Sequence, residues 1–435
     1  MHQSREAALA HPFRQPASRF RPGRVTWAGL FDITGTDGRP GGFKAPVWGE
    51  TIFRDSAMDA EQFARDLLAK AGIEINGNKP WDIEVHDPNL YARVIAEGTI
   101  GLGEGYMDRQ WDCRQLDEFF NRVVAADLGK HLPFSFGTAM LFLRSKYRNQ
   151  QTKRRSLETV ETFYDLPVEV FEASFDSRLT GSCGYWKDAW TLDEAQLAKQ
   201  DLVCRKIGLA ANHHVLDIGC GWGSFMGYAA EKYKARCVGT TISGNQVAYA
   251  RKRYAGLPIE FRLEDYRDFK YERKFDRVVS MGMFEHVGSK NYRRYFELAR
   301  QAMKEDGLFL LHTIWQNNRS PAIDPWMDKY IYPNGQLPSV GEITSAVEGL
   351  FVVEDVHNFG AYYDRTLVEW DKKFQANKAS VRSAIEKSGR NYDKFCRMWE
   401  YYHLSCAGGF RSRVVNVGQF ILSPNGVRGG YEPVR

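Results

Sequence analysis

The fold of this chain is decided by Val215-Leu216-Asp217-Ile218-Gly219-Cys220-Gly221-Trp222-Gly223. Its apolar, β-branched beginning predicts a short buried strand. The three glycines that follow predict a tight turn at which a ligand can approach the backbone closely. The next residues, Ser224 to Arg236, are typical of a helix. A strand, a glycine loop and a helix in this order form the ligand-binding corner of a doubly wound sheet.

Glycine loops of this kind serve dinucleotides or S-adenosylmethionine, and the surrounding residues distinguish the two. The loop has the spacing G-x-G-x-G and follows Asp217, whereas a dinucleotide fingerprint has G-x-G-x-x-G. The second predicted strand, Cys237 to Ile242, carries Thr240 and Thr241 where a dinucleotide site needs an acid. The pattern therefore favours an adenosyl sulfonium cofactor, with nicotinamide binding and a glycine turn without a ligand as alternatives.

Alternating strand and helix patterns continue beyond the glycine loop. Ser243 begins a helix with Gln246 three residues later, which is a capping-box pattern. Further strands are predicted at Ile259–Leu263, Phe275–Met281 and Leu308–Ile314. The fold class is therefore α/β, with a doubly wound, Rossmann-like sheet. Such a sheet binds its ligands at the loops that follow the strands.

The length of 435 residues suits two domains. The region after residue 56 has helical periodicity at 59–72, 90–96 and 116–126, interrupted by a glycine-rich stretch at 98–105. The predicted organisation is a poorly ordered extension at 1–56, a small, mainly helical N-terminal domain at 57–140, a basic linker at 141–160 and a catalytic domain at 161–435.

The basic linker admits two interpretations. It is either a solvated connection between domains or a patch that contacts lipid phosphates. The residues concerned are Arg144, Lys146, Arg148, Lys153, Arg154 and Arg155.

Charge and cysteine content exclude several classes of protein. The net charge of +5 is only mildly basic, and we predict no nucleic-acid partner. The seven cysteines are scattered without a C-x-x-C pair, which argues against a disulfide framework and against a metal site. No apolar run is long enough to span a bilayer, and the N-terminus lacks the apolar core of a secretory signal. We therefore expect a cytoplasmic protein.

Seven separated strings lie outside the glycine loop. They are Ser-Cys-Gly-Tyr-Trp at 182–186, Gly-Met-Phe-Glu-His-Val-Gly at 282–288, Leu-Leu-His-Thr-Ile at 310–314, Asp-Pro-Trp-Met-Asp-Lys-Tyr-Ile-Tyr-Pro-Asn-Gly at 324–335 and His-Asn-Phe-Gly-Ala at 357–361, with Ile-Asn-Gly at 75–77 and Gly-Leu-Gly-Glu at 101–104. These strings resemble the cyclopropane-fatty-acyl-phospholipid synthase family, which includes the S-adenosylmethionine-dependent cyclopropane and mycolic acid synthases. The resemblance runs from about residue 60 to about residue 420 and implies that the doubly wound, Rossmann-like sheet is that of a methyltransferase.

The resemblance implies a reaction and its partners. Family members add a methylene from S-adenosylmethionine to the cis double bond of an acyl chain in a membrane phospholipid, and close a cyclopropane ring. The alkene is a weak nucleophile, so proximity in a water-poor pocket supplies much of the rate. The resemblance further implies bicarbonate as the base that deprotonates a carbocation, and peripheral association with the inner face of the membrane. It leaves a homodimer open.

By motif position, five residues match the base cluster of the family: Cys183, Glu285, His312, Ile314 and Tyr363. The resemblance implies that Cys183 and Ile314 offer backbone N–H groups, that His312 and Tyr363 donate from their side chains, and that Glu285 accepts. Each has a structural alternative: a helix N-terminal acid for Glu285, and ordinary core packing for the others.

The residues that the resemblance assigns to the cofactor lie around the glycine loop and in a helical lid. Gln246 has the alternative role of capping partner to Ser243. The complete set is Tyr164, Ser182, Gly184, Asp217, Gly219, Gly221, Gly223, Thr241, Gln246 and Asp265.

The chain departs from the family pattern at Phe163, Pro167, Gly181 and Glu264. Because three of these lie in the lid, a lipid-binding homologue without turnover is an alternative function, and a C-methyltransferase that leaves methyl or methylene branches is another. The aromatic residues expected either to line an acyl tunnel or simply to pack in the core are Trp370, Phe374, Trp399, Tyr402 and Phe410.

Overall fold

The structure is a computed structural model and describes residues 57–131 and 149–435. The predicted extension 1–56 and the first part of the predicted basic linker, residues 141–148, lie outside the described residues. The described residues belong to one compact unit. The division of this unit into domains stays a prediction.

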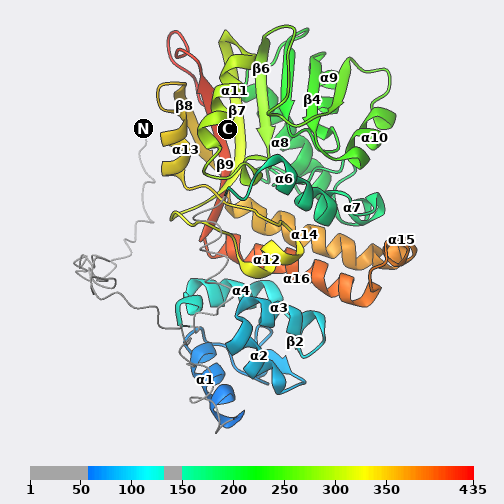
Figure 1. Cartoon of the computed structure of the whole chain (residues 1–435), viewed down its shortest axis with the longest axis vertical. Coiled ribbons are helices and arrows are strands. Elements are labelled where there is room, and N and C mark those ends of the chain that lie inside the picture. Colours follow the sequence, from blue (N-terminus) through cyan, green and yellow to red (C-terminus); the bar gives the residue numbers. More distant parts are fainter. Residues whose placement is uncertain (1–56, 132–148) are drawn as a thin grey trace, which may run out of the picture. The chain divides into compact units, whose positions relative to one another are not determined.

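A seven-stranded mixed sheet forms the centre of the catalytic part (Figure 1), with the strand order β5-β4-β3-β6-β7-β9-β8. All five predicted strands are confirmed, and two C-terminal strands were missed. Neighbours from β5 to β7 run parallel, and β9 runs antiparallel to both β7 and β8. The strands are β3 (His214–Ile218), β4 (Arg236–Thr241), β5 (Ile259–Leu263), β6 (Phe275–Met281), β7 (Met303–Gln316), β8 (Val352–Asn358) and β9 (Val415–Ser423).

Successive residues of the strands point to opposite faces of the sheet, and each face has its own helices. On one face Val278 and Leu311 pack with α11 (Tyr292–Ala302) and α13 (Val340–Val347). On the other face Val279 packs with three helices. These are α8 (Leu192–Lys206), α9 (Ser224–Tyr233) and α10 (Gly244–Arg253). The fold is the predicted doubly wound arrangement.

The order of strands reverses between β3 and β6, because the chain moves outward from β3 through β4 to β5 and then returns to the other side of β3. The glycine loop follows β3 at this reversal. The predicted helix after it ends three residues early, at Tyr233, because Lys234 takes a left-handed conformation with φ 58° and Arg236 already begins β4. Ligands of doubly wound sheets bind at such a reversal.

Residues 57–131 are mainly helical, as predicted. Gly72 has φ 67° and follows the first helix as its predicted stop. A two-stranded antiparallel ribbon joins the helices. The elements are α1 (Ala57–Ala69), β1 (Ile83–Val85), α2 (Asn89–Glu97), α3 (Thr99–Met107), β2 (Trp111–Cys113), α4 (Leu116–Ala125) and the 3-10 turn η1 (Leu128–His131).

The predicted interruption at residues 98–105 is confirmed only at Gly98, which has φ 64° and separates α2 from α3. The rest of it is wrong, because α3 runs from Thr99 through the glycine-rich stretch. Its glycines leave space for neighbours. A Cβ on Gly103 would lie 2.4 Å from Cδ1 of Trp326, and a Cβ on Gly105 would lie 2.5 Å from Cδ1 of Leu90. These glycines therefore serve close packing rather than a turn, which the sequence pattern alone did not distinguish.

A helical layer covers the catalytic sheet near the glycine loop, and two of its helices, α14 and α16, pack along each other (Figure 1). The side chain of Asn391 caps the longer one, α16, by accepting the N–H of Lys394 at 2.9 Å. Among the described residues, no helix combines the length and apolar composition needed to cross a bilayer. The helices of this layer are α6 (Lys153–Thr159), the π-helix η2 (Val160–Tyr164), α7 (Val168–Ser174), α12 (Pro325–Tyr330), α14 (Ala361–Asn377), η4 (Lys378–Val381), α15 (Arg382–Lys387) and α16 (Tyr392–Arg411).

Candidate active site

A cavity of about 240 Å³ lies at the carboxyl ends of β3, β4, β6 and β7. Most of the predicted site residues line it, although they are up to 199 positions apart in the chain. Three predicted residues do not line it: Cys183, Gly184 and Gly223. Those that do are Tyr164, Ser182, Asp217, Gly219, Gly221, Thr241, Gln246, Asp265, Glu285, His312, Ile314 and Tyr363.

The glycine loop presents its backbone to the cavity. Gly219, Gly221 and Gly223 have φ angles of 84°, 52° and 81°, which side chains rarely adopt. A Cβ on Gly221 would meet no atom within 4 Å, so this position is open toward the cavity. Gly223 differs, because a Cβ there would lie 2.7 Å from the ring of Phe261. Gly223 thus serves helix–strand packing, while Gly219 and Gly221 face the cavity.

Asp217, at the end of β3, has a buried carboxyl group with unused hydrogen-bonding capacity. Only 2% of the residue is exposed, and Oδ1 has no hydrogen-bond partner within the described part of the chain. Burial raises the pKa of Asp217 to about 7, against the opposing effect of the nearby Lys199 ammonium. A buried carboxyl oxygen without a hydrogen-bond partner destabilises the folded protein, unless a bound ligand supplies the partner.

Thr241 and Gln246 are joined to each other at the cavity wall. Thr241 Oγ1 donates to Gln246 Oε1 at 2.7 Å. The backbone N–H of Gln246 donates to Ser243 Oγ at 3.3 Å, so Ser243 caps α10 as predicted. The predicted capping box is only half formed, because the Ser243 N–H donates to Thr241 Oγ1 at 3.3 Å and not to the Gln246 side chain. The Gln246 side chain lines the cavity, and its role toward the cofactor stays a prediction.

Asp265 is paired with Arg267, a cavity-lining residue that the sequence analysis missed. Arg267 donates to Asp265 from Nε at 2.7 Å and from Nη2 at 2.5 Å. Burial alone would raise the pKa of Asp265, but the Arg267 hydrogen bonds outweigh it and hold the pKa below its usual value. Arg267 Nη1 also donates to the backbone oxygen of Gln151 at 2.9 Å. The pair fixes the wall of the cavity between β5 and α6.

Two basic residues of α6, Lys153 and Arg155, are also engaged within the chain. Lys153 forms an ion pair with Asp268. Arg155 donates to the backbone oxygen of Asn149 at 3.1 Å and to Gln150 Oε1 at 2.6 Å, and it lines the cavity. These contacts give Lys153 and Arg155 partners other than lipid phosphates. Arg144, Lys146 and Arg148 lie outside the described residues.

Glu285 lies in the short 3-10 turn η3 (Phe284–His286) directly after β6. One carboxyl oxygen, Oε1, accepts the backbone N–H of Ile314 at 2.7 Å. The other, Oε2, is buried and has no partner among the described residues. Burial raises the pKa of Glu285 to about 7, and the Ile314 N–H acts in the opposite direction. The Ile314 N–H is therefore engaged by Glu285.

His312, on β7, is 1% exposed, and neither ring nitrogen has a hydrogen-bond partner in the described part of the chain. Burial, with the charges of Lys199 and Lys206, holds the pKa of His312 well below its usual value. The imidazole is therefore neutral, with one N–H to donate and one nitrogen to accept. Tyr363, on α14, is also buried, and its ring lies 4.6 Å from that of Phe410.

Cys183 lies behind the cavity wall, where its Sγ contacts the backbone oxygen of Gly184 at 3.2 Å. Burial raises the pKa of this thiol far above its usual range. Thr366, which the sequence analysis missed, accepts the Gly184 N–H at 3.1 Å and the Trp186 indole N–H at 2.8 Å. Thr366 thus fixes the strand-like loop that carries the predicted residues 182–184.

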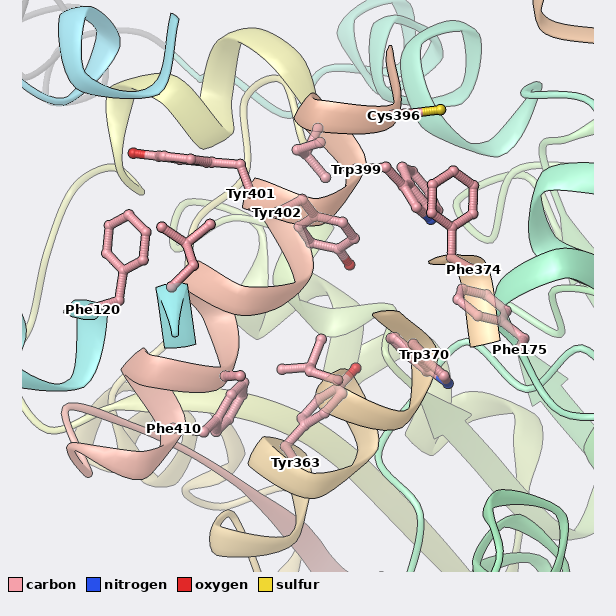
Figure 2. Packing of buried hydrophobic residues seen from close by; sticks show 14 of the residues in the cluster. Phe120, Phe175, Tyr363, Trp370, Phe374, Cys396, Trp399, Tyr401, Tyr402 and Phe410 are labelled. Carbon is pink, nitrogen blue, oxygen red and sulfur yellow. The ribbon is translucent and has the colours of Figure 1, made fainter. Parts of the chain in front are cut away.

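Aromatic side chains form a wall of the cavity, and Figure 2 shows those that α14 and α16 contribute. Trp370 and Tyr402 line the cavity, whereas Phe374, Trp399 and Phe410 pack behind it. Phe163, one of the departures from the family pattern, also lines the cavity and stacks on Trp399 at 5.6 Å. The wall is apolar and excludes water from one side of the site.

A family model described as mycolic acid cyclopropane synthetase matches residues 151–420. This range contains every predicted site residue. The chain is also 44% identical over 375 residues to the cyclopropane-fatty-acyl-phospholipid synthase of Escherichia coli K12, an alignment that covers 86% of this chain and 96% of that protein. An alignment of that length is longer than residues 149–435, so it includes part of the chain that precedes the catalytic sheet.

Two solved structures are similar over about three fifths of the chain. The cyclopropane synthase MmaA2 from Mycobacterium tuberculosis has a TM-score of 0.56 and 30% identity, covering 63% of this chain and 99% of that chain. The mycolic acid cyclopropane synthase CmaA1, solved with SAH and CTAB, has a TM-score of 0.54 and 31% identity, covering 61% of this chain and 97% of that chain.

Proposed function

The chain belongs to the mycolic acid cyclopropane synthetase family, and from this premise we propose that it is an S-adenosylmethionine-dependent enzyme that builds a cyclopropane ring on the cis double bond of an unsaturated acyl chain. We propose a membrane phospholipid as the carrier of that chain, because the E. coli relative is named for this substrate. One observation carries the proposal: a glycine cradle, an aromatic wall and polar atoms of Glu285 and His312 that have no partner among the described residues share a single cavity.

The residues at the carboxyl ends of β3 and β4 fit the cofactor. Gly221 leaves open space where a side chain would otherwise stand, and Asp217 Oδ1 is a buried acceptor without a partner among the described residues. Thr241 and Gln246 offer further polar atoms at the same wall. When bound, S-adenosylmethionine supplies an electrophilic methyl group on a sulfonium. The backbone of Gly219 and Gly221 would hold its amino-acid end.

The aromatic wall fits an apolar acyl chain. Phe163, Trp370 and Tyr402 line the cavity, and Figure 2 shows the rings of Trp370 and Tyr402. Because an alkene is a weak nucleophile, the wall must hold the double bond in line with the methyl group and keep water out. Methyl addition leaves a positive charge on the neighbouring alkene carbon. Aromatic faces stabilise such a charge without capturing it.

Ring closure then requires a proton to leave the added methyl group. Glu285 Oε2 and the neutral His312 ring are the buried polar atoms that remain to hold a base or take up the proton. We propose that His312 and Tyr363 donate to a bound bicarbonate and that Glu285 orients it. The Ile314 N–H is less suited to this role than expected, because Glu285 Oε1 already accepts it.

A lipid substrate requires contact with a membrane, and we propose peripheral association with its cytoplasmic face. The name of the E. coli relative supports the lipid substrate, and pelleting with phospholipid vesicles tests the association. A homodimer is likewise proposed and is checked by light scattering of the purified chain.

The test of the function uses purified protein, S-adenosylmethionine and vesicles of a cis-monounsaturated phospholipid, with and without added bicarbonate. Proton NMR of the extracted lipid is expected to show upfield cyclopropane protons. Mass alone is insufficient, because a ring and a methylene branch both add CH2. New methyl or vinylidene signals would identify a C-methyltransferase instead. Cofactor binding without any lipid product would contradict the proposal and favour a lipid-binding homologue.

A further inference from the structure

Helix α8 carries three fully buried polar side chains on one face, and the reaction described above does not use them. Gln196, Lys199 and Gln200 are each 0% exposed. Their spacing of three and four residues places them together on the helix surface. The helix begins with a capping box between Thr191 and Glu194, which fixes where this face points. A fully buried lysine is uncommon in proteins, because burial penalises its charge.

All three side chains hold one loop, which ends at the cavity. Lys199 Nζ donates to Ser182 Oγ at 2.7 Å, and Gln196 Nε2 donates to the backbone oxygen of Ser182 at 2.7 Å. Gln200 Nε2 donates to Thr180 Oγ1 at 3.3 Å. Ser182 lines the cavity, whereas Lys199 lies directly behind it. Lys199 therefore influences the cavity through its hydrogen bond to the Ser182 hydroxyl.

The pair lies where the strand order reverses. Ser182 Cβ is 4.0 Å from the position of a Cβ built on Gly282, the first residue after β6. Lys199 also interacts electrostatically with Asp217, at the end of the neighbouring strand β3. The other charged or titratable groups that face it are Asp176, Cys183 and His312. The ammonium thus stands beside the glycine loop.

The hydrogen bond from Lys199 determines what Ser182 can do. Because the ammonium is a donor only, Ser182 Oγ accepts from it, and the hydroxyl proton is left to donate elsewhere. A hydroxyl held in this way, with a positive charge behind it, suits an anionic oxygen. Asp217, whose Oδ1 has no partner in the part of the chain that the structure describes, suits a cation. Together the two match a zwitterion, such as the ammonium and carboxylate of an amino acid.

We propose that Lys199 is a positioning residue that holds Ser182 as a hydrogen-bond donor to a carboxylate-type anion in the cavity. The inference rests on the proposed function, which supplies two anions of this chemistry: the carboxylate of the cofactor and bicarbonate. The zwitterion match favours the cofactor. Lys199 itself does not touch the reacting atoms.

The same helix offers a matched control. Lys206 is also fully buried, but its Nζ lies 2.9 Å from Nδ1 of His357 and has no contact with Ser182. Lys206→Met therefore removes a buried ammonium from α8 without touching the loop. Ser182→Ala removes the hydroxyl and leaves the lysine in place.

The test is calorimetric binding of two ligands, S-adenosylhomocysteine, which has the carboxylate, and methylthioadenosine, which lacks the whole amino-acid end. Lys199→Met and Ser182→Ala are each expected to raise the Kd of S-adenosylhomocysteine about tenfold or more and to change that of methylthioadenosine less than twofold. The Kd of S-adenosylhomocysteine for the double variant is expected not to exceed that of the weaker-binding single variant, because Lys199 and Ser182 act as one unit. Lys206→Met is expected to leave both Kd values unchanged.

Measurements of turnover show whether the anion that Ser182 binds is bicarbonate and not the carboxylate of the cofactor. If the affinity for S-adenosylhomocysteine is unchanged but the half-saturating bicarbonate concentration rises in both variants, the anion held is bicarbonate. An equal loss of affinity for both adenosine ligands would show that Lys199 and Ser182 have a merely structural role, and it would overturn the inference. The inference would also be overturned if neither Kd nor the half-saturating bicarbonate concentration changed. If Lys199→Met does not fold, Ser182→Ala decides alone. Failure of the unaltered protein to bind either ligand would instead refute the proposed function.

Discussion

One oxygen of the Glu285 carboxyl group accepts a hydrogen bond, and the other has no partner within residues 57–131 and 149–435. This asymmetry predicts how Glu285 responds to substitution. In Glu285→Gln the amide oxygen can still accept the Ile314 N–H, so the fold of the turn should survive. The second position becomes an NH2 group, which cannot accept a proton or orient an anion in the same way. We expect turnover on vesicles to fall on the order of a hundredfold or more. The Kd of S-adenosylhomocysteine should stay within about twofold.

The same substitution should change how stability depends on pH. Burial raises the pKa of Glu285 from 4.5 to about 7 in the folded protein. Below pH 4.5 the Glu285 carboxyl group is protonated in both the folded and the unfolded protein. Between pH 4.5 and pH 7 the folded protein binds more protons than the unfolded protein, so the free energy of unfolding falls as pH rises. A shift of this size corresponds to at most about 3 kcal/mol.

Glu285→Gln removes this contribution. Relative to the unaltered protein, the variant is expected to gain stability as pH rises from about 5 to about 8. The measurement is urea denaturation of both proteins without ligand at each pH. Asp217 has a pKa raised to about 7 as well, but its contribution cancels in the difference. A constant difference across this pH range would contradict the burial of a titrating Glu285 carboxyl.

At the residue scale, the sequence was informative for side chains near the carboxyl end of a strand. Asp217, Glu285 and His312 could be placed because the strand pattern and the motif agree. Lys199 was missed, since a lysine on a helix is ordinarily solvated. Its signal was present in hindsight: it shares a helix face with the apolar Ala195 and Leu202.

At the scale of elements, helix α3 shows that glycines can select a packing distance. Gly103→Ala should favour the isolated helix by up to about 1 kcal/mol. The new Cβ would, however, stand 2.4 Å from Cδ1 of Trp326, a fully buried side chain of α12. We expect a net loss of about 1–3 kcal/mol in the free energy of unfolding, measured by urea denaturation.

Gly341→Ala is the matched control for Gly103→Ala. Gly341 lies in the first turn of α13, is exposed, and a Cβ there would meet nothing within 4 Å. It should leave stability unchanged or raise it by up to about 1 kcal/mol. The same small gain in Gly103→Ala would show that α3 and α12 do not pack as closely as described.

The elements that the sequence revealed are those with one clear periodicity. Strands β3 to β7 were predicted because apolar residues run through them and the helices between them alternate. Strand β9 was missed because Asn416, Gly418 and Gln419 interrupt its apolar pattern, although all of it except Val415 is buried. Strand β8 was missed because it is an edge strand with largely exposed or half-exposed side chains. Their place in the sheet comes from long-range pairing, which no local pattern encodes.

At the scale of the molecule, residues 57–131 are joined to the helical layer mainly along α16. Arg411 near the end of α16 pairs with Asp117 at 2.6 Å and Glu118 at 3.1 Å on α4, and with Asp364 at 2.9 Å on α14. Its pKa is raised: burial opposes the charge, but the carboxylates outweigh it. Deleting residues 60–130 would therefore expose buried surface of α16 as well as remove the segment. A smaller change is the better test of what the segment does.

Gly408 offers that change, because α4 and α16 approach closest there. A Cβ on Gly408 would lie 2.6 Å from the backbone nitrogen of Asn121 and 2.7 Å from the backbone oxygen of Asp117, and backbone atoms yield only if α4 moves. Gly408→Ala is therefore expected to lower the free energy of unfolding by about 1–3 kcal/mol. If the segment 57–131 docks the enzyme on lipid, turnover on vesicles should fall several-fold while the Kd of S-adenosylhomocysteine stays unchanged.

Gly409→Ala, one residue further along α16, separates this effect from a general response of the helix. The nearest atom to its new Cβ, Cγ2 of Val415, would lie at 3.6 Å, which is ordinary contact. This control should retain both stability and vesicle activity. Equal behaviour of the two variants would contradict the close approach of α4 and α16. Lower stability of Gly408→Ala with full activity on vesicles would show instead that the joint supports the fold alone and that residues 57–131 do not bring the cavity to the lipid.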